Sequence, residues 1–191
     1  MQKQQGNERL NYTINLSGQS VGDDKPLQFI IDCLHEYRID ASSICFEITE
    51  TAAVANLDSA RVFIAQLHEL GCKFALDDFG SGLSSFAYLQ RLPVDYLKID
   101  GALVRNMQAN PVDQAMVSAV AEVGKVMGLK TIAEFVEDRE TLKLLQKMGV
   151  DYAQGYVVMK PVPLEQELQR LRPSGAAVPH AIVPSVSGRR S

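Results

Sequence analysis

Residues 73–85 read KFALDDFGSGLSS, and this stretch decides the fold class. A short apolar run over residues 73–76 meets two adjacent aspartates, Asp77 and Asp78, and then a loop of glycine and serine. An apolar run bounded by such a loop is typical of a buried strand in a parallel sheet. We therefore expect a strand over residues 73–77 that carries functional groups at its carboxyl end.

The same pattern recurs outward from this stretch in both directions. Five more short runs alternate with segments of helical periodicity, at residues 12–16, 44–48, 96–100, 131–135 and 151–154. This alternation is the pattern of a parallel α/β fold. Six strand–helix units are fewer than the eight of a closed (β/α)8 barrel, which takes about 250 residues. By count alone, a six-stranded open sheet fits as well.

Two of the intervening helices can be placed in detail. The first carries an apolar face at helical spacing and stops at Gly71, and its members are Ala60, Phe63, Ile64 and Leu67. The second is capped by Asn110, with Pro111 at its first position and Gly128 at its end. On this second helix we expect four residues to face the core, namely Met116, Val120, Val123 and Met127. A shorter helix is expected around residues 86–92, before Pro93.

Composition sets the broad class of the chain. Of its 191 residues, 46% are hydrophobic and 22% charged, and the formal net charge is -4. This is the balance of a globular domain, and it does not indicate a surface that holds nucleic acid. No apolar run approaches the length of a membrane span, and residues 1–5 have no apolar segment behind them as a signal peptide has. We therefore expect a cytoplasmic protein.

Three segments can be separated by composition. Residues 1–9 form a polar lead-in, residues 10–172 form the folded domain, and residues 173–191 are rich in proline, serine, glycine and alanine without any period. The last segment is expected to be a disordered tail.

Every apolar run ends in a residue that can bind a metal ion or transfer a proton. These strand-end residues are Asn15, Glu47, Asp77, Asp78, Lys98, Asp100, Glu134 and Gln154. Any single one reads equally well as a solvent-facing residue where a strand meets its loop. Because the carboxyl ends of parallel strands gather functional groups, six such endings out of six favour a shared site.

The residue types at these ends predict the chemistry. Carboxylate and amide oxygens without histidine or cysteine select a hard cation such as Mg²⁺ or Mn²⁺. Adjacent Asp77 and Asp78 can reach two ions, and two such ions suit phosphodiester hydrolysis. Lys98 can orient the attacking water or neutralise charge in the transition state. The alternative for Lys98 is a salt bridge to Asp100 or Asp77.

Two further features lie beside the strand ends. The loop over residues 79–85 can fold its amides into an anion-binding nest, although such a loop is weak evidence by itself. Glu50 lies three residues after Glu47, where it either braces the neighbouring loop or caps the next helix.

Taken in order, the strand-end segments resemble the EAL family of bacterial cyclic di-GMP phosphodiesterases. The resemblance spans residues 10 to about 172 and rests on six segments: 15–17 (NLS), 47–50 (EITE), 77–82 (DDFGSG), 97–100 (LKID), 133–137 (AEFVE) and 154–156 (QGY). It implies an incomplete TIM-like (β/α)8 barrel of the EAL type with about six of its units present. It also implies hydrolysis of cyclic di-GMP to linear pGpG with Mg²⁺ or Mn²⁺.

The resemblance also implies a role for each matched residue. The residues that match metal ligands are Asn15, Glu47, Asp77 and Asp78. Lys98 matches the lysine near the attacking water, and Glu134 a carboxylate suggested as general base or metal partner. Three others fall at further site positions, namely Asp100, Glu137 and Gln154. Glu50 matches a residue that holds the loop after the third strand. Such domains are often homodimers and often follow a sensor or diguanylate cyclase domain.

The chain departs from the family pattern in two places. The sequence Glu-Ala-Leu, whose glutamate ligates metal, does not occur, so we expect an N-terminally truncated domain. Phe135 stands where glycine is common in the family. Three functions therefore stay open: a phosphodiesterase whose activity needs the missing segment, a non-catalytic module that binds cyclic di-GMP, and another two-metal barrel hydrolase.

Overall fold

The computed structural model describes residues 11–80, 86–163 and 166. The predicted lead-in, the predicted tail and the expected glycine and serine nest at residues 81–85 lie outside the described residues. The described residues fall into two compact units. The first unit comprises residues 11–76 and 86–95, and the second comprises residues 77–80 and the chain from residue 96 onward.

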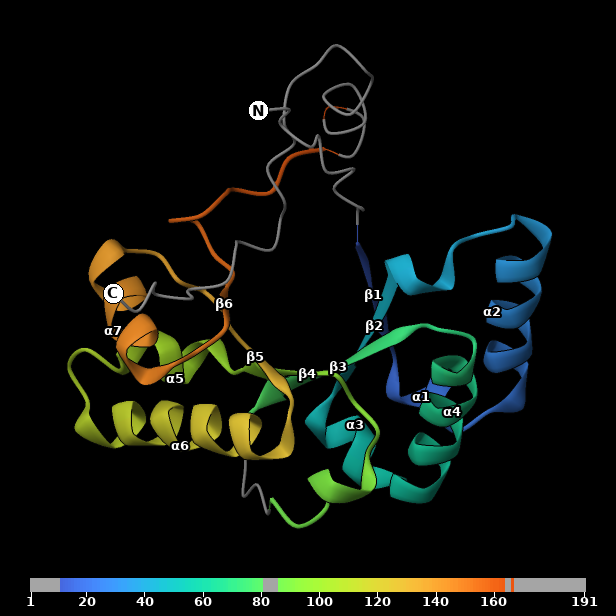
Figure 1. Cartoon of the computed structure of the whole chain (residues 1–191), viewed down its shortest axis with the longest axis horizontal. Coiled ribbons are helices and arrows are strands. Elements are labelled where there is room, and N and C mark those ends of the chain that lie inside the picture. Colours follow the sequence, from blue (N-terminus) through green and yellow to red (C-terminus); the bar gives the residue numbers. More distant parts are fainter. Residues whose placement is uncertain (1–10, 81–85, 164–165, 167–191) are drawn as a thin grey trace, which may run out of the picture. The chain divides into compact units, whose positions relative to one another are not determined.

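All six predicted strands form, and they follow one another in a single sheet in the order of the sequence (Figure 1). Pairing is parallel between β1 and β2, between β4 and β5, and between β5 and β6. The strands are β1 (Tyr12–Leu16), β2 (Ile44–Thr49), β3 (Lys73–Phe79), β4 (Tyr96–Ile99), β5 (Lys130–Ala133) and β6 (Tyr152–Ala153). The α/β prediction is therefore confirmed.

Helices connect successive strands, as the alternating pattern predicts. They are α1 (Gly18–Val21), α2 (Asp24–Glu36), α3 (Glu50–Ala55), α4 (Leu57–Glu69), α5 (Gly101–Asn106), α6 (Pro111–Met127) and α7 (Arg139–Met148). Between Phe86 and Leu92 the chain forms turns and a 3₁₀ segment, Leu89–Arg91, in place of the expected helix. Pro93 follows closely and cannot donate a backbone hydrogen bond, so too few residues remain for a regular helix.

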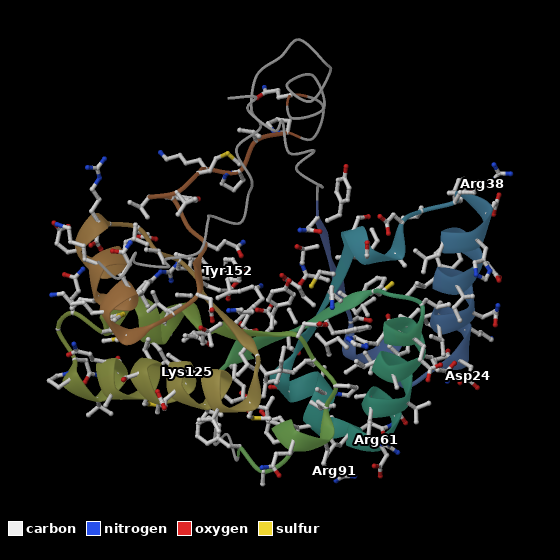
Figure 2. The ribbon with its side chains drawn as sticks, viewed as in Figure 1. Asp24, Arg38, Arg61, Arg91, Lys125 and Tyr152 are labelled. Carbon is white, nitrogen blue, oxygen red and sulfur yellow. The ribbon has the colours of Figure 1, made fainter. Side chains whose placement is uncertain are left out.

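In the first unit, α1, α3 and α4 lie together (Figure 1). The apolar face predicted for α4 is confirmed, because Ala60, Phe63, Ile64 and Leu67 are all buried. By contrast, β1 at the edge of the sheet leaves Tyr12 45% exposed. Charged residues at the two ends of α2, Asp24 and Arg38, project away from the ribbon (Figure 2).

In the second unit, α6 packs against β4 and β5. Asn110 caps α6 by accepting a hydrogen bond from the backbone N–H of Val112, as predicted. The predicted inner face is correct in part: Val120 is buried and Val123 and Met127 are half-buried, but Met116 is 37% exposed. The buried residues are Val117, Val120, Ala121 and Gly124.

Small residues explain why Met116 lies outside the buried face. A Cβ atom at Gly124 would lie 2.6 Å from Thr131 Cγ2, so only glycine allows α6 to approach β5 this closely. Counting large apolar residues misplaces such a residue when alanine and glycine form the packed seam.

Two aspartates support the amino ends of strands in the same way. Asp95, just before β4, binds Lys73 Nζ at 2.8 Å and the N–H of Phe74 at 2.9 Å. Asp151, just before β6, binds Lys130 Nζ at 2.6 Å and the N–H of Thr131 at 2.9 Å. Each aspartate thereby satisfies the N–H group of the second residue of the preceding strand.

These contacts change the ionisation of Asp151. Partial burial, the largest single influence, raises the pKa of the Asp151 carboxyl, but the hydrogen bonds from Lys130 and Thr131 together bring it below its ordinary value. The hydrogen bond to Asp151 in turn raises the pKa of Lys130.

Replacing Asp151 by asparagine removes this charge while keeping an acceptor for Thr131. We expect Asp151→Asn to lower the free energy of unfolding by about 1 kcal/mol at neutral pH. Because the folded pKa is depressed, the contribution is complete above the unfolded pKa of about 3.9 and is lost as the pH falls through the folded pKa. Urea titrations at several pH values measure the difference in free energy of unfolding between the unaltered chain and the variant. Glu122→Gln, at an exposed position, is the control. A difference that persists undiminished at pH 3 contradicts this account.

Candidate functional site

Asp78 breaks the regular alternation of β3. Successive side chains of a strand point to opposite faces of the sheet, so adjacent Asp77 and Asp78 would normally diverge. Asp78 instead has φ 56°, in the left-handed region. Aspartate tolerates this conformation better than most residues, and the N–H of Asp78 donates to Asp77 Oδ1 at 3.0 Å. This local turn brings both carboxylates to one side.

Three carboxylates gather there. Asp77, Asp78 and Glu134 each place an oxygen so that these atoms all lie within 4.8 Å of one another. Lys98 Nζ lies 2.9 Å from Asp77 Oδ1 and 2.8 Å from Glu134 Oε1. Lys98 is only 3% exposed, and a buried ammonium is stable only when it is paired in this way. The predicted salt bridge to Asp77 is therefore present.

The electrostatics of the cluster favour an added cation. Partial burial raises the pKa of Asp78, the charges of Asp77 and Asp100 raise it further, and the charge of Lys98 acts in the opposite direction. Three ionised carboxylates and one ammonium leave a formal charge of -2 (three negative, one positive). The donors are all oxygens, which suits Mg²⁺ or Mn²⁺ better than zinc. These residues therefore fit a divalent metal.

A second left-handed residue follows Glu134. Phe135 has φ 51°, a conformation that costs an L-amino acid roughly 1–2 kcal/mol and is uncommon for an aromatic residue. The backbone of Gln154 fixes this turn, because its N–H donates to the carbonyl of Ala133 at 2.8 Å and its carbonyl accepts from Val136 at 3.0 Å. The turn sends Glu134 inward, where it is 9% exposed, and leaves Phe135 49% exposed.

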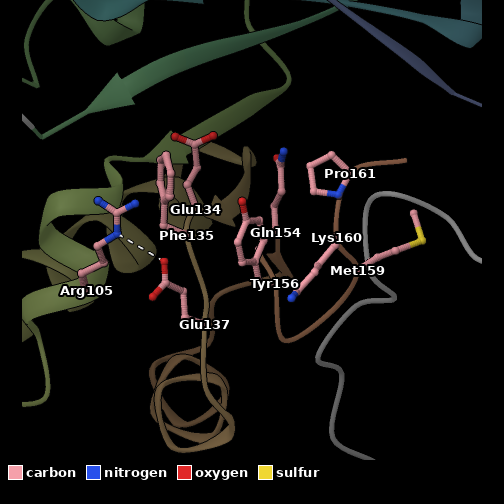
Figure 3. Close-up of a pocket in the computed structure, with 10 residues that line it drawn as sticks. Arg105, Glu134, Phe135, Glu137, Gln154, Tyr156, Met159, Lys160 and Pro161 are labelled. Carbon is pink, nitrogen blue, oxygen red and sulfur yellow. Dashed lines mark ion pairs between the residues drawn. The ribbon is translucent and has the colours of Figure 1, made fainter. Parts of the chain in front are cut away.

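A pocket of about 500 Å³ opens beside Glu134 and Phe135 (Figure 3). Its polar lining residues are Arg105, Glu134, Glu137, Gln154 and Lys160, and its apolar or aromatic ones include Phe135, Tyr156, Met159 and Pro161. Arg105 Nε lies 3.7 Å from Glu137 Oε1, and the Arg105 guanidinium carbon lies 4.0 Å from the centre of the Phe135 ring. The volume is within the roughly 300–1,000 Å³ of small-molecule sites.

The first unit holds the other predicted residues. Asn15 on β1 and Glu47 on β2 are register partners in a parallel ladder, so both side chains leave the same face of the sheet. Glu50 is 7% exposed, and its Oε1 accepts a hydrogen bond from the Tyr88 hydroxyl. Tyr88 follows β3 in the chain, so this contact links the start of α3 to the segment that leads to β4. Burial and the bond to Glu50 together strongly raise the pKa of Tyr88.

The structure thus brings together Asp77, Asp78, Lys98 and Glu134, and places Glu137 and Gln154 in the adjoining pocket. Asp100 caps α5 through the N–H of Ala102 and contributes to the field at Asp78. Sequence reasoning missed four pocket residues, namely Arg105, Met159, Lys160 and Pro161. Their position in the chain could have indicated them. Arg105 lies on the short helix directly after Asp100, and the other three follow the end of β6.

The raised pKa of Asp78 has a testable consequence for metal-free protein. At neutral pH the Asp78 charge destabilises the folded state, because its folded pKa lies above the unfolded value of about 3.9. Asparagine removes the charge and also tolerates the left-handed backbone. Asp78→Asn should therefore raise the urea midpoint slightly at pH 7 in EDTA, and this gain should fade as the pH falls towards about 4.

The control for this prediction is Asp113→Asn, which removes an acidic residue from the first turn of α6. Loss of a favourable interaction with the helix dipole should lower the midpoint slightly, opposite in sign to Asp78→Asn. A lower urea midpoint for Asp78→Asn at pH 7 would show that the neighbouring carboxylates do not destabilise the folded state by repelling Asp78.

Comparison with known sequences gives a consistent result. The chain matches the EAL domain family over residues 1–161. It is 47% identical over 152 residues to the cyclic di-GMP phosphodiesterase PdeB of Shewanella oneidensis, covering 80% of this chain and 18% of that protein. It is 36% identical over 162 residues to the cyclic di-GMP phosphodiesterase PdeF of Escherichia coli, covering 85% of this chain and 22% of that protein. The chain thus spans about a fifth of the length of these curated relatives.

Solved structures show the same likeness. A MucR phosphodiesterase in complex with cyclic di-GMP superimposes with a TM-score of 0.80 at 32% identity, covering 84% of this chain and 65% of that one. The EAL domain of Mycobacterium smegmatis DcpA superimposes with a TM-score of 0.77 at 34% identity, covering 87% of this chain and 74% of that one. The strand-end acids, the α/β architecture and these matches lead to one conclusion: the chain belongs to the EAL domain family and has its TIM-like barrel fold, with six strands and no closure of the sheet among the residues that the structure describes.

Proposed function

We propose that this domain hydrolyses cyclic di-GMP to linear pGpG with Mg²⁺ or Mn²⁺. The observation that carries the proposal is the buried Lys98, which binds two carboxylates of a three-carboxylate cluster. That combination of oxygen ligands and one fixed ammonium suits phosphodiester hydrolysis. The names of the curated relatives and the bound ligand of the MucR structure supply the substrate.

In this proposal Asp77, Asp78, Asn15 and Glu47 hold the metal, and Glu134 acts as general base or as a further metal partner. When bound, divalent cations supply activation of a water molecule and stabilisation of the leaving oxygen. Glu50 supports the loop after β3 through Tyr88.

Lys98 has a distinct part in this scheme. Its two carboxylate partners hold the ammonium in one position, so that no reorganisation is needed when negative charge develops on the phosphoryl oxygens. It can also donate a hydrogen bond that orients the attacking water. Asp100, Glu137 and Gln154 complete the site on the substrate side, the last two as lining residues of the pocket.

The wider proposal concerns the protein around this domain. We place it in the cytoplasm as a homodimer, within a polypeptide that also carries a sensor or diguanylate cyclase domain. A bifunctional diguanylate cyclase and phosphodiesterase of Pseudomonas aeruginosa, 32% identical over 163 residues, supports the last point. Among the described residues, no helix has both the length and the apolar character needed to cross a membrane.

Asp77→Asn provides the direct test of the metal role. With Mn²⁺ and cyclic di-GMP, the unaltered domain should release pGpG, and Asp77→Asn should lower the rate by at least about a hundredfold because a ligand and the Lys98 partner are both weakened. Chromatography of the products measures the rate. Mn²⁺ should also raise the melting temperature of the unaltered chain but hardly that of the variant. Asp113→Asn, a change in the first turn of α6 outside the carboxylate cluster, serves as control.

The outcomes separate the three functions. If the gene encodes residues upstream of Met1, the longer product is assayed in parallel with the 191-residue chain. Turnover in the longer product alone supports a phosphodiesterase that needs the Glu-Ala-Leu segment. Tight binding of cyclic di-GMP without turnover in both supports a non-catalytic module. Cleavage of another phosphodiester, with cyclic di-GMP untouched, supports a different hydrolase. Full activity in Asp77→Asn excludes a ligand role for Asp77.

A further inference from the structure

Phe135 is an exposed aromatic residue on rigid backbone at the wall of the pocket. Its side chain is 49% exposed and its backbone is left-handed. Hydrogen bonds from the backbone of Gln154 to Ala133 and Val136 hold the turn before and after Phe135. The next part of the pocket wall is rigid as well, because the backbone of Gly155 packs so closely on Val136 that a Cβ atom would lie 2.3 Å from its nitrogen. The backbone that carries the ring is therefore held in place.

Two neighbours fix the ring itself. Gly101 lies against its edge, where an added Cβ atom would come within 2.0 Å of Phe135 Cδ2. The Arg105 guanidinium stacks on the ring, with its carbon 4.0 Å from the ring centre. Figure 3 shows Arg105 on one side of Phe135 and Tyr156 on the other. Gly101 thus makes the space that Phe135 needs, and the two residues form a matched pair.

The side of Phe135 towards Tyr156 faces the pocket. Tyr156 is 61% exposed, and Lys160 Nζ lies 5.6 Å from the centre of its ring. Two aromatic rings, each accompanied by a cation, form walls suited to a flat, electron-rich heterocycle. Glu134 belongs both to this pocket and to the carboxylate cluster, so the pocket adjoins the cluster.

We propose that Phe135, positioned by Gly101 and Arg105, is a base-stacking residue that holds one guanine of the dinucleotide against the pocket wall. This inference rests on the proposed function and adds a specificity residue to it. A stacked base contributes equally to the bound substrate and to the transition state. Phe135 therefore acts on KM, while Lys98 and the carboxylates act on kcat.

The first test is kinetic. Phe135→Ala should raise KM for cyclic di-GMP about tenfold and leave kcat within about twofold, whereas Phe135→Tyr should keep both values. Gly101→Ala should raise KM in the same way by displacing the ring, but should add nothing in a Phe135→Ala background. A residue with a purely structural role would lower stability and kcat together. An unchanged KM in Phe135→Ala would overturn the proposal.

The second test uses the absence of tryptophan from the chain. Phe135→Trp in an Asp77→Asn background provides a single fluorophore, whose emission should be strongly quenched by stacked guanine when cyclic di-GMP is added. Val126→Trp, at a position 78% exposed on α6 outside the pocket, should show no such change. Binding itself is measured independently by equilibrium dialysis. If the Phe135→Trp variant binds without quenching, this inference alone is overturned, whereas no binding to the unaltered chain overturns the proposed function as well.

Discussion

The candidate site depends on one buried cation between two carboxylates. Lys98 lies in β4, Asp77 at the end of β3, and Glu134 directly after β5, so the ammonium links three successive strand ends. An ammonium that is 3% exposed is unstable without such partners, and two acids this close repel each other without the lysine. Each group therefore requires the others. The mutual requirement holds the three side chains together, and a site arranged in advance in this way is what the proposed electrostatic catalysis needs.

Two left-handed residues, Asp78 and Phe135, turn regular strands into a site. A strand that keeps its alternation would send one of the two adjacent aspartates away from the cluster. At both positions the chain accepts an unfavourable backbone conformation, and neighbouring hydrogen bonds hold it in place. Strain of this kind is often concentrated at functional positions. Here its result is visible in the geometry, since the turn at Asp78 places that carboxylate beside Asp77 and Glu134, and the turn at Phe135 places its ring in the pocket wall.

The sequence predicted the six strands and the position of the acidic cluster, because both follow from local pattern. Apolar runs locate strands, and the residue after each run locates the carboxyl end. Met116 was wrongly placed on the inner face of α6, because packing at Gly124, not the number of large apolar residues, decides which face is buried. Arg105 was missed as a pocket residue for a related reason: its contact with Phe135 depends on the conformation of one residue, and no pattern in a single sequence reports a positive φ.

Aspartates in this chain also show why position along a strand decides their role. The tripeptide Val-Asp-Tyr occurs at residues 94–96 and 150–152, in each case at the amino end of a strand. Both aspartates, Asp95 and Asp151, bind a lysine and the backbone where the preceding strand begins. Asp77 and Asp78 are chemically identical to them but lie at the carboxyl end of β3. In barrels of this kind the amino ends serve stability and the carboxyl ends serve chemistry. The repeated tripeptide is therefore a signal of support for the strands, and it separates Asp95 and Asp151 from the acids of the candidate site.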